Sequence, residues 1–322
     1  MFAVYAESFS TEDPLSGLVV GERPDPEVPP GWVAVRVRAA ALNHHDLWSL
    51  KGVGLAESAL PMILGCDAAG HDPDGNEVIV HAVISDPSWR GDETLDPGRS
   101  LLSERYQGAF ADTVVVPASN VVPKPASLSF EEAACLPTAW LTAYRMLFKQ
   151  GGLKPGDSVL VQGAGGGVAT ALIALARAAR LRVYATSRDE AKRERALELG
   201  AHEVFEPGAR LPRRVDAVME TVGRATWSHS VKSLRPGGTL VISGTTSGPN
   251  PDNAELTRVF FLQLRVIGST MGTRAELAAL TEMLDVSGVR PVIDRVLPMH
   301  QAREGFAAMA EGELFGKVVF TR

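Results

Sequence analysis

The stretch that decides the fold is Ser158-Val-Leu-Val-Gln-Gly-Ala-Gly-Gly-Gly-Val168, which an apolar segment and Arg182-Val-Tyr-Ala-Thr186 follow. This order predicts a buried strand, a glycine-rich turn, a helix and a second strand. The consecutive glycines lack the side chains that would hold a ligand away from the backbone. The helix that starts near Val168 presents free N–H groups and the positive end of its dipole. The turn is therefore predicted to bind an anion, and the pyrophosphate of a dinucleotide suits this pattern.

The residues after the second strand indicate which dinucleotide fits. An acidic residue that binds a ribose 2′-hydroxyl is typical about 20 residues after the glycines. Here Ser187 and Arg188 follow the strand, and Lys192 lies one helical turn further on. A small hydroxyl and two cations suit a 2′-phosphate, although the neighbouring Asp189 opposes it. We therefore expect NADP(H) rather than NAD(H). The alternative is that Arg188 and Lys192 are solvated surface charges.

Composition limits the class of protein. The chain has 322 residues, of which 45% are hydrophobic and 22% are charged, and its formal net charge is −6. Its length predicts two domains, and its charge argues against nucleic acid or a membrane surface as a partner. No segment resembles a signal peptide or a membrane span. Cys66 and Cys135 are too few for a disulfide framework, so we expect a cytoplasmic protein.

Two patterns divide the chain, and together they predict an α/β fold. Residues 1–120 contain short β-like runs and are expected to form a β-rich domain. Further on, strands at 158–162, 182–186, 215–219, 239–243 and 265–268 alternate with helices at 168–180, 189–199, 225–234 and 253–262. This alternation predicts a doubly wound parallel sheet over residues 121–287, with a last helix at 274–287. Two β-like pieces in residues 288–322 are expected to return to the first domain.

Several motifs in a fixed order carry a resemblance to a known family. They are Ala41-Leu-Asn-His-His-Asp-Leu-Trp48, Pro61-Met-Ile-Leu-Gly-Cys-Asp-Ala-Ala-Gly70, Gly108-Ala-Phe-Ala-Asp112, Leu141-Thr-Ala-Tyr144, the turn at 163–169, Leu234-Arg-Pro-Gly-Gly-Thr-Leu240 and Gly316-Lys-Val318. In this order they resemble the medium-chain dehydrogenase/reductase superfamily, and within it the zinc-free branch of quinone and enoyl reductases. The resemblance implies a GroES-like catalytic domain, a Rossmann NADP(H)-binding domain and a homodimer.

The expected cofactor-binding residues come from the glycine turn, from loops at the carboxyl ends of the parallel strands and from the resemblance. The resemblance alone places Lys317 near the phosphates. Ser269 lies in the segment 268–273, which follows a strand. This segment is expected either to close over the nicotinamide or to cap the next helix. The full set is Thr142, Gly165, Gly166, Gly167, Val168, Ser187, Arg188, Lys192, Val222, Ser243, Gly244, Thr245, Ser269 and Lys317.

The zinc ligands of the metal-dependent relatives are changed in this chain. By the motif alignment, Asn43 stands at the first cysteine, Cys66 at the histidine and Thr138 at the last ligand. Asn and Thr are poor zinc ligands. Residues 86–107 contain no cysteine, although a lobe of some relatives holds a structural zinc through four. We therefore expect no zinc.

The remaining polar residues of the first motif are the candidates for catalysis: Asn43, His44, His45 and Asp46. A histidine could supply a proton near neutral pH, and a structural role for each histidine is equally open. An improvised metal site of His44, His45, Asp46, Cys66 and Asp67 is disfavoured. Adjacent residues of an extended segment point to opposite sides, so His44 and His45 would not both face one ion.

Without zinc, an activated hydride acceptor is favoured, because it delocalises the charge that it gains. The sequence therefore predicts an NADPH-dependent oxidoreductase that reduces a small-molecule quinone or α,β-unsaturated carbonyl. The alternatives are a zinc-free alcohol or carbonyl dehydrogenase and a non-catalytic NADPH-binding sensor. Phe260 and Phe261 are expected in the core, with a substrate wall or a subunit interface as alternatives.

Overall fold

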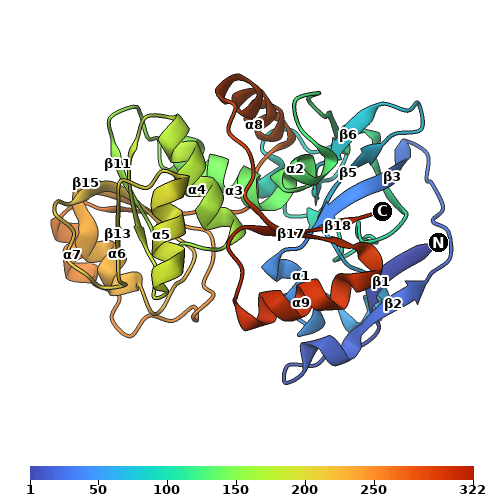
Figure 1. Ribbon diagram of the computed structural model, residues 1–322, viewed down its shortest axis with the longest axis horizontal. Helices are drawn as coiled ribbons and strands as arrows, with labels where there is room; N and C mark the ends of the chain where they lie inside the picture. The colour runs from blue at the N-terminus through green and yellow to red at the C-terminus, as the bar shows by residue number, and fades with distance from the viewer. The chain divides into compact units, whose positions relative to one another are not determined.

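A computed structural model describes residues 1–322, which form two compact units. The first comprises Met1–Leu141 and Met271–Arg322, and the second comprises Thr142–Thr270. Both chain ends therefore belong to the first unit (Figure 1). These boundaries differ from those expected near residues 120 and 287, because α8 (Arg274–Ser287) packs on β10 (Val121–Pro123) and on the π-helical turn η5 (Leu136–Trp140) of the first unit.

The second unit is built on a six-stranded sheet whose neighbouring strands all pair in parallel. Its order is β13-β12-β11-β14-β15-β16. The strands are β11 (Ser158–Val161), β12 (Arg182–Thr186), β13 (Glu203–Phe205), β14 (Val215–Glu220), β15 (Leu234–Ile242) and β16 (Arg265–Gly268). This is the doubly wound order of a dinucleotide-binding fold, in which the chain reverses direction across the sheet between β11 and β14.

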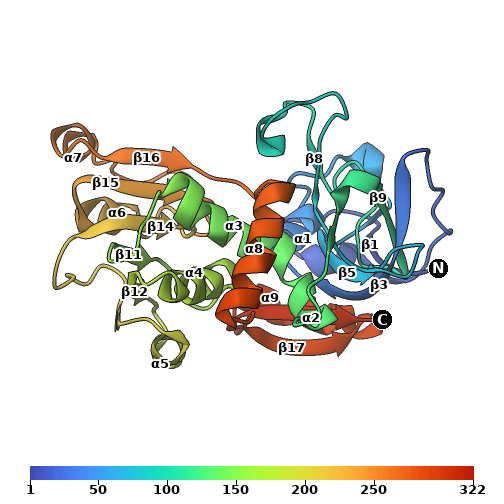
Figure 2. The same ribbon diagram turned by 90° about the horizontal axis from the view of Figure 1, so that it is seen from above.

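Helices connect these strands close to the predicted places. They are α4 (Gly167–Ala178), α5 (Glu190–Leu199), α6 (Trp227–Ser233) and α7 (Leu256–Phe261), while α3 (Leu141–Tyr144) and the π-helical η6 (Arg145–Gln150) precede β11. The helices α4 and α5 contact β11, β12 and β13, whereas α6 contacts β14 and β15 (Figure 2). Right-handed crossovers that run in opposite directions from the centre of a sheet place their helices on opposite faces. The sheet is therefore covered on both faces, as the sequence predicts.

The first unit is mainly β. Its strands are β1 (Phe2–Ala6), β2 (Leu18–Glu22), β3 (Trp32–Ala41), β4 (Met62–Ile63), β5 (Asp67–His71), β6 (Glu77–Val80), β7 (Val83–Ile84), β8 (Ser100–Leu101), β9 (Thr113–Pro117), β10, β17 (Ile293–Pro298) and β18 (Lys317–Thr321). Seven of them form one sheet in the order β10-β6-β5-β3-β18-β17, with β9 also on β3. The strand β18 pairs antiparallel with β3, so the tail of the chain returns to the first unit, as expected.

Aromatic packing holds this tail in place. The helices of the first unit are α1 (His44–Leu50), α2 (Phe130–Ala134), α8 and α9 (Ala302–Glu311), besides the π-helical η5 and single 3-10 turns. Phe306 of α9 stacks on Phe320 of β18 at a ring distance of 6.3 Å, and Phe110 meets Phe320 edge-on at 5.2 Å. All three rings are buried. Their burial stabilises the closure of the unit by its last strand.

Two local expectations are wrong. The residues 44–50 form a helix rather than an extended segment, because Asn43 begins it and its backbone N–H donates to Asp46 Oδ2 at 2.9 Å. Phe260 and Phe261 do not lie in the core, since their exposed fractions are 69% and 76%. The helix α7 that carries them has no buried residue. None of the helices combines the length and apolarity that crossing a bilayer requires.

Candidate functional site

The glycine turn between β11 and α4 has backbone angles that favour glycine and an open start of the helix. Gly163 and Gly165 adopt φ values of +74° and +133°, which favour glycine. Gly166 caps the N-terminus of α4, a helix of 12 residues, and a Cβ added there would meet nothing within 4 Å. The backbone at the start of α4 is thus open to a ligand. Its free N–H groups and helix dipole favour an anion there.

A buried glutamine fixes the strand that leads into this turn. Gln162 accepts from Thr186 Oγ1 at 2.6 Å, and its amide donates to Ser230 Oγ at 2.9 Å. These bonds join the ends of β11 and β12 to α6. Because all three residues are buried, the bonds are shielded from water and hold the edge of the sheet in one arrangement.

A buried carboxylate shapes the next loop, and the sequence analysis did not identify it. Glu220 ends β14 and accepts from the backbone N–H groups of Val222 (2.7 Å) and Gly223 (3.0 Å). It also accepts from the hydroxyls of Thr226 (2.8 Å) and Ser230 (2.6 Å). Four donors fully compensate the burial of this charge. An acidic residue at the end of an apolar strand was the available sequence signal.

The expected 2′-phosphate residues lie together after β12. Ser187 is buried and its hydroxyl accepts from Asp189 N–H at 3.2 Å. Arg188 is exposed, and no hydrogen bond or ion pair involves its side chain. Lys192 lies in the first turn of α5, where its backbone N–H donates to the cap Asp189. The side chain of Arg193 donates to Ser187 O at 2.8 Å and so fixes the turn.

The other cofactor candidates of this unit follow its parallel strands. Val222 follows β14, and its Cγ2 would lie 2.7 Å from a Cβ at Gly163, so these two loops touch. Ser243, Gly244 and Thr245 follow β15, where Ser243 N–H donates to Glu220 O at 2.9 Å. Two further candidates are polar and largely enclosed: Thr142 is buried, and the buried hydroxyl of Ser269 has no hydrogen-bond partner.

A buried polar cluster includes Asn43 and Thr138, two of the three residues that stand at zinc-ligand positions of the relatives. Lys317 Nζ donates to Leu42 O (2.8 Å) and Asn43 Oδ1 (2.6 Å), and it lies 3.4 Å from Asp67 Oδ2. Asp67 also accepts from Asn43 Nδ2 at 2.9 Å and from Thr138 Oγ1 at 2.5 Å. Burial raises the pKa of Asp67, and the ammonium and these hydrogen bonds oppose that rise. The ammonium of Lys317 therefore has three protein acceptors and no hydrogen left for a cofactor phosphate.

These residues do not fit the zinc of the metal-dependent relatives. The amide of Asn43 is used on both sides, because Nδ2 also donates to Ala41 O at 3.2 Å and Oδ1 accepts from Lys317. The hydroxyl of Thr138 donates to Asp67. The lysine ammonium thus takes up acceptor atoms of Asn43 and Asp67 that a metal would need.

A second polar group lies around Cys66. His45 Nδ1 is 3.4 Å from Cys66 Sγ, and His45 Nε2 is 3.1 Å from Glu104 Oε1. Burial favours the neutral imidazole, but the interactions with Cys66 and Glu104 outweigh it and raise the pKa of His45 well above its usual range. Asp46 accepts from Asn43 N–H and Gly65 N–H, both at 2.9 Å. Burial raises the pKa of Asp46 to about 6.

The four catalytic candidates thus differ in what they can offer a ligand. Asn43, His45 and Asp46 use their polar atoms within the protein. His44 is exposed, and neither of its ring nitrogens makes a hydrogen bond. Protein atoms around the ring and the charge of Lys317 lower its pKa, which favours the neutral form at pH 7. A neutral imidazole carries one N–H donor and one acceptor.

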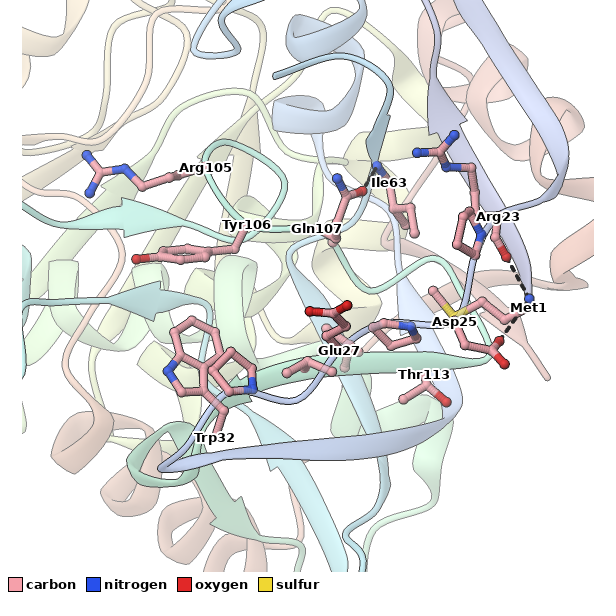
Figure 3. A pocket seen from close by; sticks show the side chains of 16 residues that line it. Met1, Arg23, Asp25, Glu27, Trp32, Ile63, Arg105, Tyr106, Gln107 and Thr113 are labelled. Atoms are coloured by element: carbon pink, nitrogen blue, oxygen red, sulfur yellow. Dashed lines mark hydrogen bonds and ion pairs between the residues drawn. The ribbon is translucent and has the colours of Figure 1, made fainter. Parts of the chain in front are cut away.

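A cavity of about 420 Å³ lies elsewhere in the first unit (Figure 3). The segment from Arg23 to Pro29, the loop from Arg105 to Gly108 and the strands β3 and β9 line it. Trp32 and Tyr106 pack together there at a ring distance of 5.0 Å. None of the expected catalytic or cofactor residues lines this cavity, so it is separate from the candidate site.

A doubly wound nucleotide domain and a GroES-like β domain define a class of nicotinamide-dependent oxidoreductases. Two families match the chain: "Alcohol dehydrogenase GroES-like domain" over residues 29–126 and "Zinc-binding dehydrogenase" over residues 167–286. A zinc-type alcohol dehydrogenase-like protein of Schizosaccharomyces pombe is 30% identical over 97% of this chain and 98% of its own. The chain therefore belongs to the medium-chain dehydrogenase/reductase superfamily.

Other relatives carry different activities in their names. The acryloyl-coenzyme A reductase of Sulfurisphaera tokodaii is 26% identical over 95% of this chain and 97% of its own, and the quinone oxidoreductase of Mus musculus is 27% identical over 87% and 86%. Among solved structures, an NAD-dependent alcohol dehydrogenase has a TM-score of 0.92 and 34% identity over the whole of both chains. A 2-octenoyl-CoA carboxylase reductase in complex with NADP and 2-octenoyl-CoA has a TM-score of 0.91 and 27% identity, over 99% of this chain and 87% of its own.

Replacement of the buried ammonium tests the polar cluster. Lys317→Met should lower the free energy of unfolding by about 3–5 kcal/mol, because it leaves Asp67 buried without its cation. Urea unfolding followed by circular dichroism measures this change. Lys154→Met, at an exposed lysine, is the control and should stay within about 0.5 kcal/mol of the wild type. An equally small effect of both substitutions would show that Lys317 does not compensate the cluster.

Proposed function

We propose that this protein reduces a quinone or an α,β-unsaturated carbonyl compound with NADPH, by direct hydride transfer and without a catalytic zinc. The observation that carries the proposal is the closed cluster of Asn43, Asp67, Thr138 and Lys317. In this cluster Asn43 and Thr138, which stand at two of the three zinc-ligand positions, both donate to Asp67. An acceptor that delocalises negative charge needs no Lewis acid, whereas a simple ketone or alcohol gains much from one.

In this mechanism the chain binds and orients both reactants, and a bound nicotinamide supplies the hydride. His44 is the proposed donor to the substrate oxygen, because it is the catalytic candidate with free ring nitrogens. Its lowered pKa keeps the ring neutral at pH 7, so that it offers one N–H to the oxygen on which charge develops. Asn43 and Asp46 are positioning residues, since they fix the first turn of the helix that carries His44.

NADP(H) is the proposed cofactor. The open backbone at Gly166 suits the pyrophosphate, and Gly165, Gly167 and Val168 complete this turn. The free guanidinium of Arg188, beside the buried Ser187, suits a 2′-phosphate. The complex of a related carboxylase reductase with NADP supports this choice, whereas the similarity to an NAD-dependent alcohol dehydrogenase opposes it. A comparison of the steady-state kinetics with NADPH and with NADH therefore distinguishes the two cofactors.

The relatives named acryloyl-coenzyme A reductase and quinone oxidoreductase support an activated acceptor. A zinc-free alcohol or carbonyl dehydrogenase is the second candidate, because the solved structure with 34% identity is named an alcohol dehydrogenase. The product distinguishes them: an enone reductase yields a saturated ketone, and a carbonyl reductase yields an alcohol. The cytoplasmic location stays a prediction.

A homodimer is also proposed. Phe260 and Phe261 are exposed on α7, and Val266 is 43% exposed on β16, the edge strand of the parallel sheet. Large apolar side chains beside an unpaired strand edge are typical of an association surface. Sedimentation of the wild-type chain checks this proposal, and a monomer at micromolar concentration would overturn it.

The first test is NADPH oxidation by metal-stripped protein with quinones, enones, aldehydes and simple ketones. We expect turnover of the quinones or enones, with simple ketones reduced at least tenfold more slowly, since only the activated acceptors spread the added charge. Product analysis identifies which bond is reduced. Tight NADPH binding without turnover of any acceptor would favour the sensor, and preferred reduction of ketones would favour the second candidate.

The 2′-phosphate assignment is tested by Arg188→Ala. Loss of a charged hydrogen bond to a phosphate should raise the KM for NADPH about tenfold or more, and the KM for NADH should change little. Steady-state kinetics with both nucleotides measures this difference. The matched control is Arg214→Ala, at an exposed arginine of the same unit. An equal effect of Arg188→Ala on both nucleotides would refute the assignment.

The two histidines are separated by single substitutions. His44→Ala should lower kcat about 10²-fold, the usual contribution of a positioned acid–base group, without a loss of stability. His45→Ala should instead lower the free energy of unfolding, because it removes the hydrogen-bond partner of both Cys66 and Glu104. Turnover and urea unfolding are measured for each variant. An unchanged kcat in His44→Ala would remove this histidine from the mechanism.

A further inference from the structure

We infer that Cys66, His45 and Asp46 form a binding site for one divalent zinc ion, separate in its ligand set from the zinc positions of the relatives. Only Cys66 occurs in both sets. The inference does not require the proposed reaction, because the ion at this place would be structural.

The geometry of the sulfur and nitrogen atoms supports a shared ion. Zinc bonds of about 2.3 Å to sulfur and 2.1 Å to nitrogen, at a tetrahedral angle, place the two ligand atoms about 3.6 Å apart. Cys66 Sγ and His45 Nδ1 lie 3.4 Å apart. The ligand atoms of Cys66, His45 and Asp46 all lie within 4.8 Å of one another, so a small shift of the carboxylate lets all three reach one ion.

The surroundings of His45 provide a second, independent observation. A histidine that binds a metal through one nitrogen usually donates its other N–H to a carboxylate, which fixes the ring. His45 Nε2 lies 3.1 Å from Glu104 Oε1, and this leaves Nδ1 directed at Cys66. Glu104 is itself held, because Oε2 accepts from Leu101 N–H at 3.1 Å. Glu104 is thus a positioning residue for a ligand.

The remaining neighbours keep the site closed. Cys66 and Asp46 have no exposed surface, and the buried Ser103 places its hydroxyl 3.7 Å from the sulfur. Each oxygen of Asp46 accepts only one backbone N–H, so a lone pair of each stays available. Structural zinc usually has four ligands. Besides the three proposed residues, the oxygens nearest the sulfur are Leu102 O, to which the thiol donates at 3.2 Å, and Ser103 Oγ, and they are the candidates for the fourth ligand. Binding would displace the protons on Sγ and Nδ1.

His44 and Asp67, the other members of the improvised site considered from the sequence, do not belong to it. The helical start of α1 separates His44 from His45 around the helix axis, and Asp67 binds Lys317 and Thr138. Because residues 44–50 are helical, their side chains do not alternate between two opposite sides as in an extended segment.

Metal content tests the inference. The purified chain, produced with added zinc and then passed over a desalting column, is analysed for zinc by mass spectrometry, and we expect one zinc ion per chain. Cys66→Ala should lose it, and Cys135→Ala is the matched control, because Cys135 is the other fully buried cysteine and has no histidine partner. Cobalt in place of zinc should show a thiolate-to-metal absorption band that Cys66→Ala lacks.

A second variant keeps the test informative if Cys66→Ala fails to fold. Glu104→Gln retains the hydrogen-bond acceptor but removes the charge, and should weaken zinc binding about 10- to 100-fold in a competition titration with a chelator. Glu93→Gln, in the same segment, should not. No zinc in the wild type, or equal zinc in the wild type and in Cys66→Ala, would overturn the inference. Reduction of enones by the metal-stripped protein is measured separately and concerns only the proposed function.

Discussion

The buried ammonium of Lys317 is the interaction on which the first unit depends. It comes from the last strand, yet its acceptors are Leu42 O and Asn43 Oδ1, with Asp67 close by. These acceptors lie at the end of β3, at the start of α1 and at the start of β5. A charge that is almost fully buried is tolerated only with such compensation. The contact therefore couples the closure of the sheet by the chain's end to the shape of the loop that carries the catalytic candidates.

In the second unit, buried hydrogen bonds of a neutral and an acidic side chain hold the ends of the strands in place. Gln162 and Glu220 end adjacent strands, and both bind Ser230 of α6. Glu220 also accepts hydrogen bonds from the backbone N–H groups of Val222 and Gly223. Loops at the carboxyl ends of parallel strands would otherwise be the least restrained part of such a domain. These buried bonds give the loops one conformation before any ligand binds.

The sequence predicted the strands and helices of the second unit more accurately than the side-chain contacts of the polar residues in the first unit. The spacing of glycines and apolar runs predicted β11, α4 and β12 to within one or two residues at each end, because local geometry and burial set such patterns. The motif resemblance indicated that Asn43 and Thr138 replace zinc ligands. It did not show that Asn43 uses its whole amide internally, or that His45 pairs with Glu104, since partners 59 residues apart leave no periodic signal. Phe260 and Phe261 were assigned to the core from hydrophobicity alone, which does not distinguish an interior from an association surface.

The sequence by itself determined the fold class, the glycine turn, the two cationic residues Arg188 and Lys192 after β12, and the replacement of zinc ligands by Asn43 and Thr138. Each of these depends on residue type and local spacing, which are properties of the chain before it folds. Only the tertiary structure decided which histidine is free, where the charge of Lys317 lies and which residues surround Cys66. Those outcomes depend on side chains that come from distant segments and share a few ångströms of low-dielectric interior. There, each polar atom must find a partner, and the identity of that partner sets its chemistry.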